Sequence, residues 1–292
     1  MTESTEPFSY HKAFARNIGW LTHAEQDELR HKRIAIAGMG GVGGVHLLTL
    51  ARLGIGAFHL ADFDNFDIAN FNRQVGASMS TLGQPKVEVL ADMARDINPE
   101  LHITRFPTGV TDANRAAFLE GVDLYMDSLD FFAFGARQAI FAACARLAIP
   151  AVTAAPLGMG TALLNFLPGH MSFEDYFGWG ELPDADKAAR FLVGLAPAGL
   201  HGPYLVDPSA INLAERRGPS TIMACQLCAG AAATEALKIL LGRGDVRPAP
   251  HGLHFDAYRN KLVHTWRPGG HRNPLQRLAL MLLKRRQTGA RP

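Results

Sequence analysis

A glycine-rich turn that follows a short apolar run constrains the fold of this chain more than any other feature. Residues 34–37 are apolar and suited to a β-strand, residues 45–53 have the apolar spacing of a helix, and between them stand Gly38, Gly40, Gly41, Gly43 and Gly44. Such glycines let the backbone pass close to a phosphate, and the helix start offers unpaired N–H groups to an anion. Residues 57–61 form a second predicted strand that ends at Asp62, about 20 residues after the glycines, where dinucleotide-binding folds place a carboxylate for ribose hydroxyls. The sequence therefore predicts a nucleotide-binding strand, turn and helix.

The polar residues after Asp62 narrow the class of nucleotide. A nicotinamide site needs only the ribose carboxylate here, whereas this chain continues with Asp64, Asn70, Arg73, Gln74 and, after a Gly-Gln-Pro turn, Lys86. Arginine and lysine can neutralise phosphates as charge builds on a departing pyrophosphate. The pattern favours a triphosphate.

Four motifs in order carry a resemblance to a known family: GMGGVGG, DFDNFDIANFNRQ, LGQPKVEVLADMARDINP and DSLD. The chain resembles the ThiF/MoeB/HesA adenylyltransferases, relatives of the ubiquitin-activating enzymes, over roughly residues 10–165 and more weakly over 219–245. The resemblance implies an α/β fold with a Rossmann-like, doubly wound mixed sheet. It also implies that ATP and Mg²⁺ are used to adenylate the C-terminal carboxylate of a small ubiquitin-like sulfur carrier or a related peptide.

The resemblance assigns a role to each candidate residue. The ATP-binding set is Gly38, Gly40, Gly41, Gly43, Asp62, Asp64, Asn70 and Gln74, and the catalytic set is Arg16 from the partner subunit, Arg73, Lys86 and Asp130, of which Asp130 organises Mg²⁺. Simpler interpretations remain for some of them: Arg16 as a solvated surface residue, and Lys86 as a surface lysine after a turn. Asp127 is expected to be a cap or turn residue, as aspartates in loops usually are.

The chain departs from the family at two places. In the family an arginine follows the magnesium aspartate at five residues, whereas Arg137 follows Asp130 at seven, so the turn at residues 131–134 is longer and more apolar. There is also no cysteine between Cys144 and Cys225, which excludes a thiolate intermediate from the crossover loop of residues 169–218. We expect catalysis to stop at the acyl-adenylate.

The remaining cysteines are expected to be core residues. Zinc-binding members of the family use two CxxC pairs, and this chain has one, formed by Cys225 and Cys228. Zinc also accepts a mixed set of two cysteines and two histidines, which His251 and His254 could complete. Because both cysteines start a probable buried helix, packing is favoured over structural zinc. An odd number of cysteines also argues against a disulfide framework.

Composition and pattern give the expected organisation. Net charge is +2, which implies no strong attraction to nucleic acid, and no apolar run suits a membrane span or signal peptide, so we expect a cytoplasmic protein without membrane contact. The predicted parts are a disordered start (1–12), an ATP-binding core (13–168), the crossover segment (169–218), a C-terminal part with a dimer helix and carrier-docking strands (219–268) and a basic amphipathic tail (269–292). The family also implies a homodimer. The tail could meet an anionic membrane or an acidic partner, but docking on its own domain is favoured.

Three other functions compete with this prediction. A nicotinamide or flavin oxidoreductase could use the same turn, but Arg73, Gln74 and Lys86 would then lack a purpose. A non-catalytic adenylating fold would be expected to lack the lysine or the aspartates. Adenylation of a different peptide, or of a tRNA-linked carboxylate, keeps the chemistry and changes the substrate. Apart from tRNA in that alternative, no nucleic-acid partner is expected.

Overall fold

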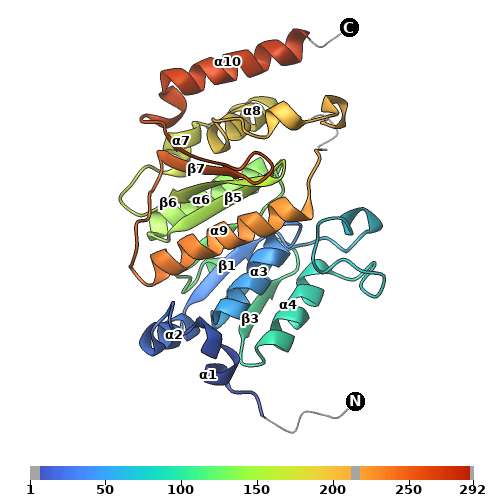
Figure 1. Cartoon of the computed structure of the whole chain (residues 1–292), viewed down its shortest axis with the longest axis vertical. Coiled ribbons are helices and arrows are strands. Elements are labelled where there is room, and N and C mark those ends of the chain that lie inside the picture. The colour runs from blue at the N-terminus through green and yellow to red at the C-terminus, as the bar shows by residue number, and fades with distance from the viewer. Residues whose placement is uncertain (1–6, 212–217, 290–292) are drawn as a thin grey trace.

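The protein is built on one eight-stranded mixed sheet with helices on both faces (Figure 1). The computed structural model describes residues 7–211 and 218–289, with side chains described up to residue 285. The strand order is β3-β2-β1-β4-β5-β6-β7-β8. The strands are β1 (Arg33–Ala37), β2 (Ala57–Ala61), β3 (His102–Phe106), β4 (Leu124–Asp127), β5 (Ala151–Leu157), β6 (Gly160–Phe166), β7 (His251–Asp256) and β8 (Lys261–Trp266). The predicted doubly wound α/β class is confirmed.

The order of the strands reverses beside β1. Strands β3, β2, β1, β4 and β5 are parallel, and β5 to β8 pair antiparallel. The chain runs outward from β1 to β2 and β3, and then returns to place β4 on the other side of β1. In sheets of this kind ligands bind at the carboxyl ends of the strands where the order reverses. The glycine turn after β1 lies at that point.

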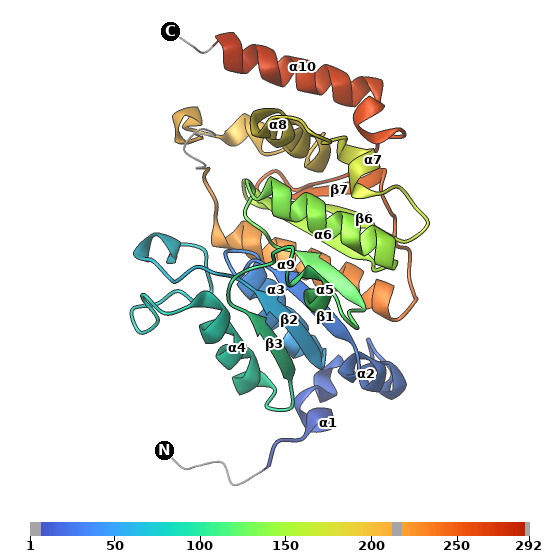
Figure 2. The same ribbon diagram turned by 180° about the vertical axis from the view of Figure 1, so that it is seen from behind.

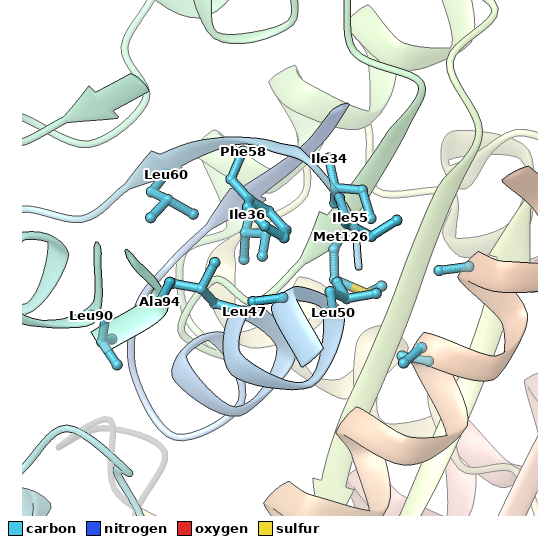
Figure 3. Packing of buried hydrophobic residues seen from close by; sticks show 14 of the residues in the cluster. Ile34, Ile36, Leu47, Leu50, Ile55, Phe58, Leu60, Leu90, Ala94 and Met126 are labelled. Atoms are coloured by element: carbon cyan, nitrogen blue, oxygen red, sulfur yellow. The ribbon is translucent and has the colours of Figure 1, made fainter. Parts of the chain in front are cut away.

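Alternating side chains on the strands form two cores. Ile34 and Ile36 face α3 (Gly43–Leu53), α4 (Lys86–Ile97) and α9 (Ile222–Leu240), whereas Ala35 and Ala37 face the other side. Figure 3 shows the first core, in which Leu47 and Leu50 of α3 and Leu90 of α4 meet the strand residues. By length and composition alone α9 could span a bilayer, but its buried residues pack on β5, β6 and α3.

The second face of the sheet is covered by aromatic-rich helices (Figure 2). They are α5 (Arg115–Phe118), α6 (Phe134–Leu147), α7 (Phe173–Phe177) and α8 (Asp184–Leu195). Phe173 and Trp179 pack with their ring centroids 4.8 Å apart, and both are buried. The segment after Phe166 therefore completes this core.

The N-terminal segment is ordered further toward the N-terminus than the sequence predicted, and its helices are short. It contains α1 (Tyr10–Ala13), the 3₁₀ turn η1 (Ala15–Asn17) and α2 (His23–Arg30). Gly19, with φ +108°, lies in the break before α2, and a capping box formed by Thr22 and Glu25 begins that helix. The prediction of disorder through residue 12 is wrong from Tyr10 onward, because that side chain is buried and donates to Gly54 O at 2.6 Å. Residues 1–6 lie outside the described part.

The C-terminal elements extend the sheet and then leave it. Short 3₁₀ turns η3 (Gly202–Tyr204) and η4 (Pro208–Ala210) precede α9, and η2 (Ile68–Asn70) follows β2. The hairpin of β7 and β8 turns at Asn260, with φ +51°, as predicted. After η5 (Gly270–Arg272), α10 (Pro274–Gly289) lies across α8 at one end of the long axis (Figure 1).

Candidate active site

The glycine turn after β1 is shaped by contacts that exclude side chains. A Cβ on Gly38, whose φ is +91°, would lie 2.3 Å from Ser128 O, and one on Gly43 would lie 1.8 Å from Gly38 O. The turn therefore rests directly on the main chain that follows β4. No side chain caps the N-terminus of α3, so its first-turn N–H groups stay available to an anion.

Asp62 is held against this turn at the end of β2. Its Oδ2 accepts from Met39 N at 2.5 Å and its Oδ1 accepts from Asp64 N at 2.8 Å. Burial raises the pKa of Asp62, and the two amide donors and Lys86 oppose that rise. The carboxylate is thus fixed beside the glycine turn.

Lys86 is buried at the start of α4, where its ammonium has a solvent-facing partner. Its side chain is 7% exposed, and Nζ lies 3.1 Å from Oδ2 of Asp64, whose side chain is 54% exposed. The main chain adds a bond from Lys86 N to Asp64 O of 2.9 Å. A buried ammonium at the positive end of a helix is stabilised further by an anion. The interpretation of Lys86 as a surface lysine is wrong.

Arg73 and Gln74 lie over the glycine turn. A Cβ on Gly41 would be 3.5 Å from Arg73 Cγ, and one on Gly40 would be 3.8 Å from Gln74 Nε2. Gln74 is buried, and its Oε1 has no partner among the described residues. Asn70 has a different role: its Oδ1 accepts from Asp67 N and caps η2.

Asp127 accepts a hydrogen bond of the expected turn kind and also forms a buried ion pair. Its Oδ1 accepts from Leu129 N at 3.3 Å, as an aspartate at the start of a turn does. Its Oδ2 lies 2.9 Å from Nε of Arg137, with side chains 2% and 3% exposed respectively, and Thr153 Oγ1 donates to the same oxygen at 2.9 Å. The ion pair was not expected from the sequence, and it leaves Asp127 unavailable to a ligand.

Arg137 fixes the loop that carries Asp130. Its guanidinium donates to Leu129 O at 2.7 Å, to Asp130 O at 3.1 Å and to Phe131 O at 3.2 Å. The ring of Phe191 from α8 covers it, with Cζ 4.6 Å from the ring centroid. Neither Arg137 nor Phe191 was assigned to the site from the sequence.

Asp130 is exposed beside the turn. Its Oδ1 accepts from Phe132 N at 2.9 Å, and the side chain is exposed to solvent. No cluster of three or more histidine, cysteine or acidic residues that could hold a metal exists within residues 7–211 and 218–289. Mg²⁺ is often bound by one or two carboxylates together with substrate phosphates and water, so Asp130 fits as a single protein ligand to such an ion.

Arg16 lies at the opposite end of α3 from the glycine turn. Its neighbour Asn17 donates from Nδ2 to Leu53 O at 3.2 Å, at the C-terminus of α3, and the 11 residues of that helix span about 16 Å. Arg16 itself is exposed in η1. Within one chain it is therefore not part of the site.

The three cysteines are free and buried. Cys225 is the cysteine nearest the glycine turn, since a Cβ on Gly41 would lie 3.1 Å from its Sγ. Burial raises the pKa of Cys225 and of Cys228, and raises the pKa of Cys144 to about 12. The four-residue zinc set is not assembled. His254 pairs with Ala162 on the sheet face opposite to Cys228, which packs in the first core.

Comparison with known proteins agrees with this geometry. The ThiF family sequence model matches residues 14–278. Over 134 residues the chain is 37% identical to the molybdopterin-synthase adenylyltransferase of Escherichia coli, covering 46% of this chain and 53% of that protein. Over 118 residues it is 36% identical to the tRNA threonylcarbamoyladenosine dehydratase of Bacillus subtilis, covering 40% and 46%. The chain thus spans about half the length of the curated relatives it matches.

Solved structures show the same fold. The crystal structure of E. coli MccB with AMPCPP and MccA superposes with a TM-score of 0.68 at 19% identity, covering 94% of this chain and 75% of that one. The crystal structure of PaaA gives a TM-score of 0.67 at 17% identity, covering 91% and 77%. The family model matches nearly the whole chain, and the chain therefore belongs to the ThiF family.

Proposed function

We propose that the protein adenylates a carboxylate, using ATP and Mg²⁺. The observation that carries the proposal is Lys86, whose buried ammonium is held by Asp64 next to the glycine turn and Asp62. An oxidoreductase requires no buried cation at this place. The unpartnered Oε1 of Gln74 and the uncapped start of α3 add free polar groups on the same side.

Each step of the reaction has a matching group in the chain. The glycine turn and α3 bind phosphates, and Asp62 accepts from the ribose hydroxyls. A substrate carboxylate oxygen bonds to the α-phosphorus, the bond to the bridging oxygen breaks, and pyrophosphate leaves with that electron pair. Lys86 and Arg73 neutralise the departing charge. Mg²⁺, held by Asp130 and the phosphates, would supply further charge neutralisation.

The chain's own nucleophiles are not needed for this step. Catalysis consists of positioning and charge stabilisation, so the acyl-adenylate is the product that the protein must protect. Because Arg16 lies at the far end of α3, it can act only in the site of a second copy, which favours a homodimer.

The most probable substrate class is a protein or peptide that ends in a carboxylate. The names of the relatives support it, since one adenylates molybdopterin synthase and the MccB structure contains MccA. The edge strand β8 offers free main-chain groups and the exposed side chains of Leu262 and Trp266 for such a partner. A tRNA-linked carboxylate is the second candidate, favoured by the similarity to a tRNA threonylcarbamoyladenosine dehydratase.

The test is Mg²⁺-dependent exchange of pyrophosphate into ATP, with small carrier proteins ending in Gly-Gly, with tRNA and with fractionated lysate. We expect one component to stimulate exchange. Lys86→Ala should abolish exchange without unfolding the protein, because the partner that it leaves, Asp64, is solvated. Lys32→Ala is the matched control, since Lys32 pairs with Glu28 at the surface of α2. Wild-type exchange by Lys86→Ala, or a bound chromophore absorbing near 340–450 nm, would refute the proposal.

A further inference from the structure

Helix α10 presents apolar side chains to solvent instead of burying them. Leu275, Leu278, Met281 and Leu282 are between 43% and 59% exposed. The amphipathic pattern of the tail had favoured docking of this helix on its own domain. The structure docks α10 through another side, where Gln276 and Leu280 line a small cavity with Phe177 and Val193. The leucine side is left uncovered by the described residues.

A basic groove runs beside this apolar stripe, between α8 and α10. It encloses about 590 Å³, and its lining contains Arg190, His271, Arg272, Arg277, Lys284 and Arg285 together with Leu280 and Met281. Met281 belongs to both the groove and the stripe. Asp186 pairs with Lys284, and the main-chain oxygens of Phe177 and Gly178 accept from Arg190. Even so, the chain has no acidic residue after Asp256, so positive charge dominates this end of the molecule.

We propose that α10 and the groove dock the protein on an anionic membrane surface. An apolar stripe flanked by lysine and arginine is the pattern of helices that lie in the lipid interface: the leucines enter the acyl boundary and the cations meet the phosphate headgroups. Because α10 is the outermost element at one end of the long axis, a flat surface can reach it (Figure 1). This inference concerns location and is independent of the proposed adenylation.

Two other occupants fit the surface less well. Nucleic acid would use the cations of the groove, but it would leave the exposed Leu275, Leu278 and Leu282 in water. A second copy packed stripe to stripe would bring Arg277 and Arg285 of each copy close to those of the other, with no acidic residue on α10 to compensate. Of these three occupants, an anionic lipid surface is the one that satisfies both the apolar and the charged components.

The experiment is flotation of the full chain with vesicles of phosphatidylcholine alone or with 30% phosphatidylglycerol. We expect binding only to the anionic vesicles, weakened by salt, and at least a tenfold loss for Leu278→Gln combined with Leu282→Gln. Arg277→Glu combined with Arg285→Glu should lose binding similarly. Met79→Gln and Lys261→Glu are matched controls, because both residues are exposed, lie outside α10 and do not line the groove, and they should leave binding unchanged.

Circular dichroism and ATP affinity, measured on every variant, establish that the fold is intact. Absence of binding to anionic vesicles by the wild-type chain would overturn the proposal. Binding to RNA that the leucine variants retain, without vesicle binding, would assign the groove to nucleic acid. A halved molar mass of the leucine variants by light scattering, without vesicle binding, would assign the stripe to a second copy.

Discussion

Replacement of Arg137 by methionine tests the internal support of the Asp130 loop. The substitution keeps the bulk of the side chain and removes its charge, so the buried carboxylate of Asp127 loses its ionic partner while Thr153 Oγ1 still donates to it. Removing one partner of a buried pair costs about 3–5 kcal/mol. The carbonyls of Leu129, Asp130 and Phe131 also lose their donor, at about 1 kcal/mol for each that water cannot reach. We therefore expect a loss of about 3–8 kcal/mol, according to how many of the three carbonyls water reaches.

Urea denaturation of four proteins would measure this loss: the wild type, Arg137→Met, Asp127→Asn and the double variant. The double variant should be more stable than Arg137→Met alone, because it no longer buries an unpaired carboxylate. Where Arg137→Met remains folded at low temperature, we expect Mg²⁺-dependent ATP affinity to fall more than Mg²⁺-independent affinity, since Asp130 loses its position. A destabilisation below about 1 kcal/mol, or additive effects of the two substitutions, would refute the reasoning.

Two further predictions concern the glycine turn and the buried histidines. Gly43→Ala should abolish ATP binding by calorimetry and cost more than about 2 kcal/mol, because its Cβ would meet Gly38 O; Gly135→Ala, which meets nothing within 4 Å, should be neutral or stabilising by up to about 1 kcal/mol. Burial lowers the pKa of His254 to about 4 and that of His46 to about 3. The unfolded chain then binds more protons than the folded one below about pH 6.5, so stability is complete above that pH and falls on acidification, by up to ~1.4 kcal/mol per pH unit for each histidine. His254→Gln should make the dependence of unfolding free energy on pH shallower between pH 6.5 and 4, and an unchanged slope would contradict this assignment.

Local pattern was sufficient where neighbouring residues decide the structure. The strand before the glycine turn, the helix after it and the strand ending at Asp62 follow from apolar spacing and glycine, and the structure places them within a residue or two. The positions of Arg73 and Gln74 over the turn, and of Lys86 beside Asp64, required the family resemblance as well. Their spacing along the chain alone does not fix how a loop folds back.

Sequence reasoning failed where tertiary packing decides. Asp127 does accept a turn hydrogen bond, but its ion pair was missed because Arg137 lies ten positions further on and only burial of both makes the pair necessary. The leucines of α10 looked like a docking face because apolar spacing does not tell which side of a helix meets the protein. In the structure Gln276 and Leu280 occupy that interface.

The hydrogen bonds of Asp62 have a consequence for how the nucleotide binds. The carboxylate is already oriented by the amides of Met39 and Asp64, and the ammonium of Lys86 by the side chain of Asp64, with no nucleotide present. Under the proposed function, these groups need not search for their bound geometry when ATP arrives. The ordering cost would then fall on folding instead of on association, which leaves more of the interaction energy to appear as affinity. We therefore expect the proposed nucleotide site to behave as a preorganised receptor, held by these three contacts.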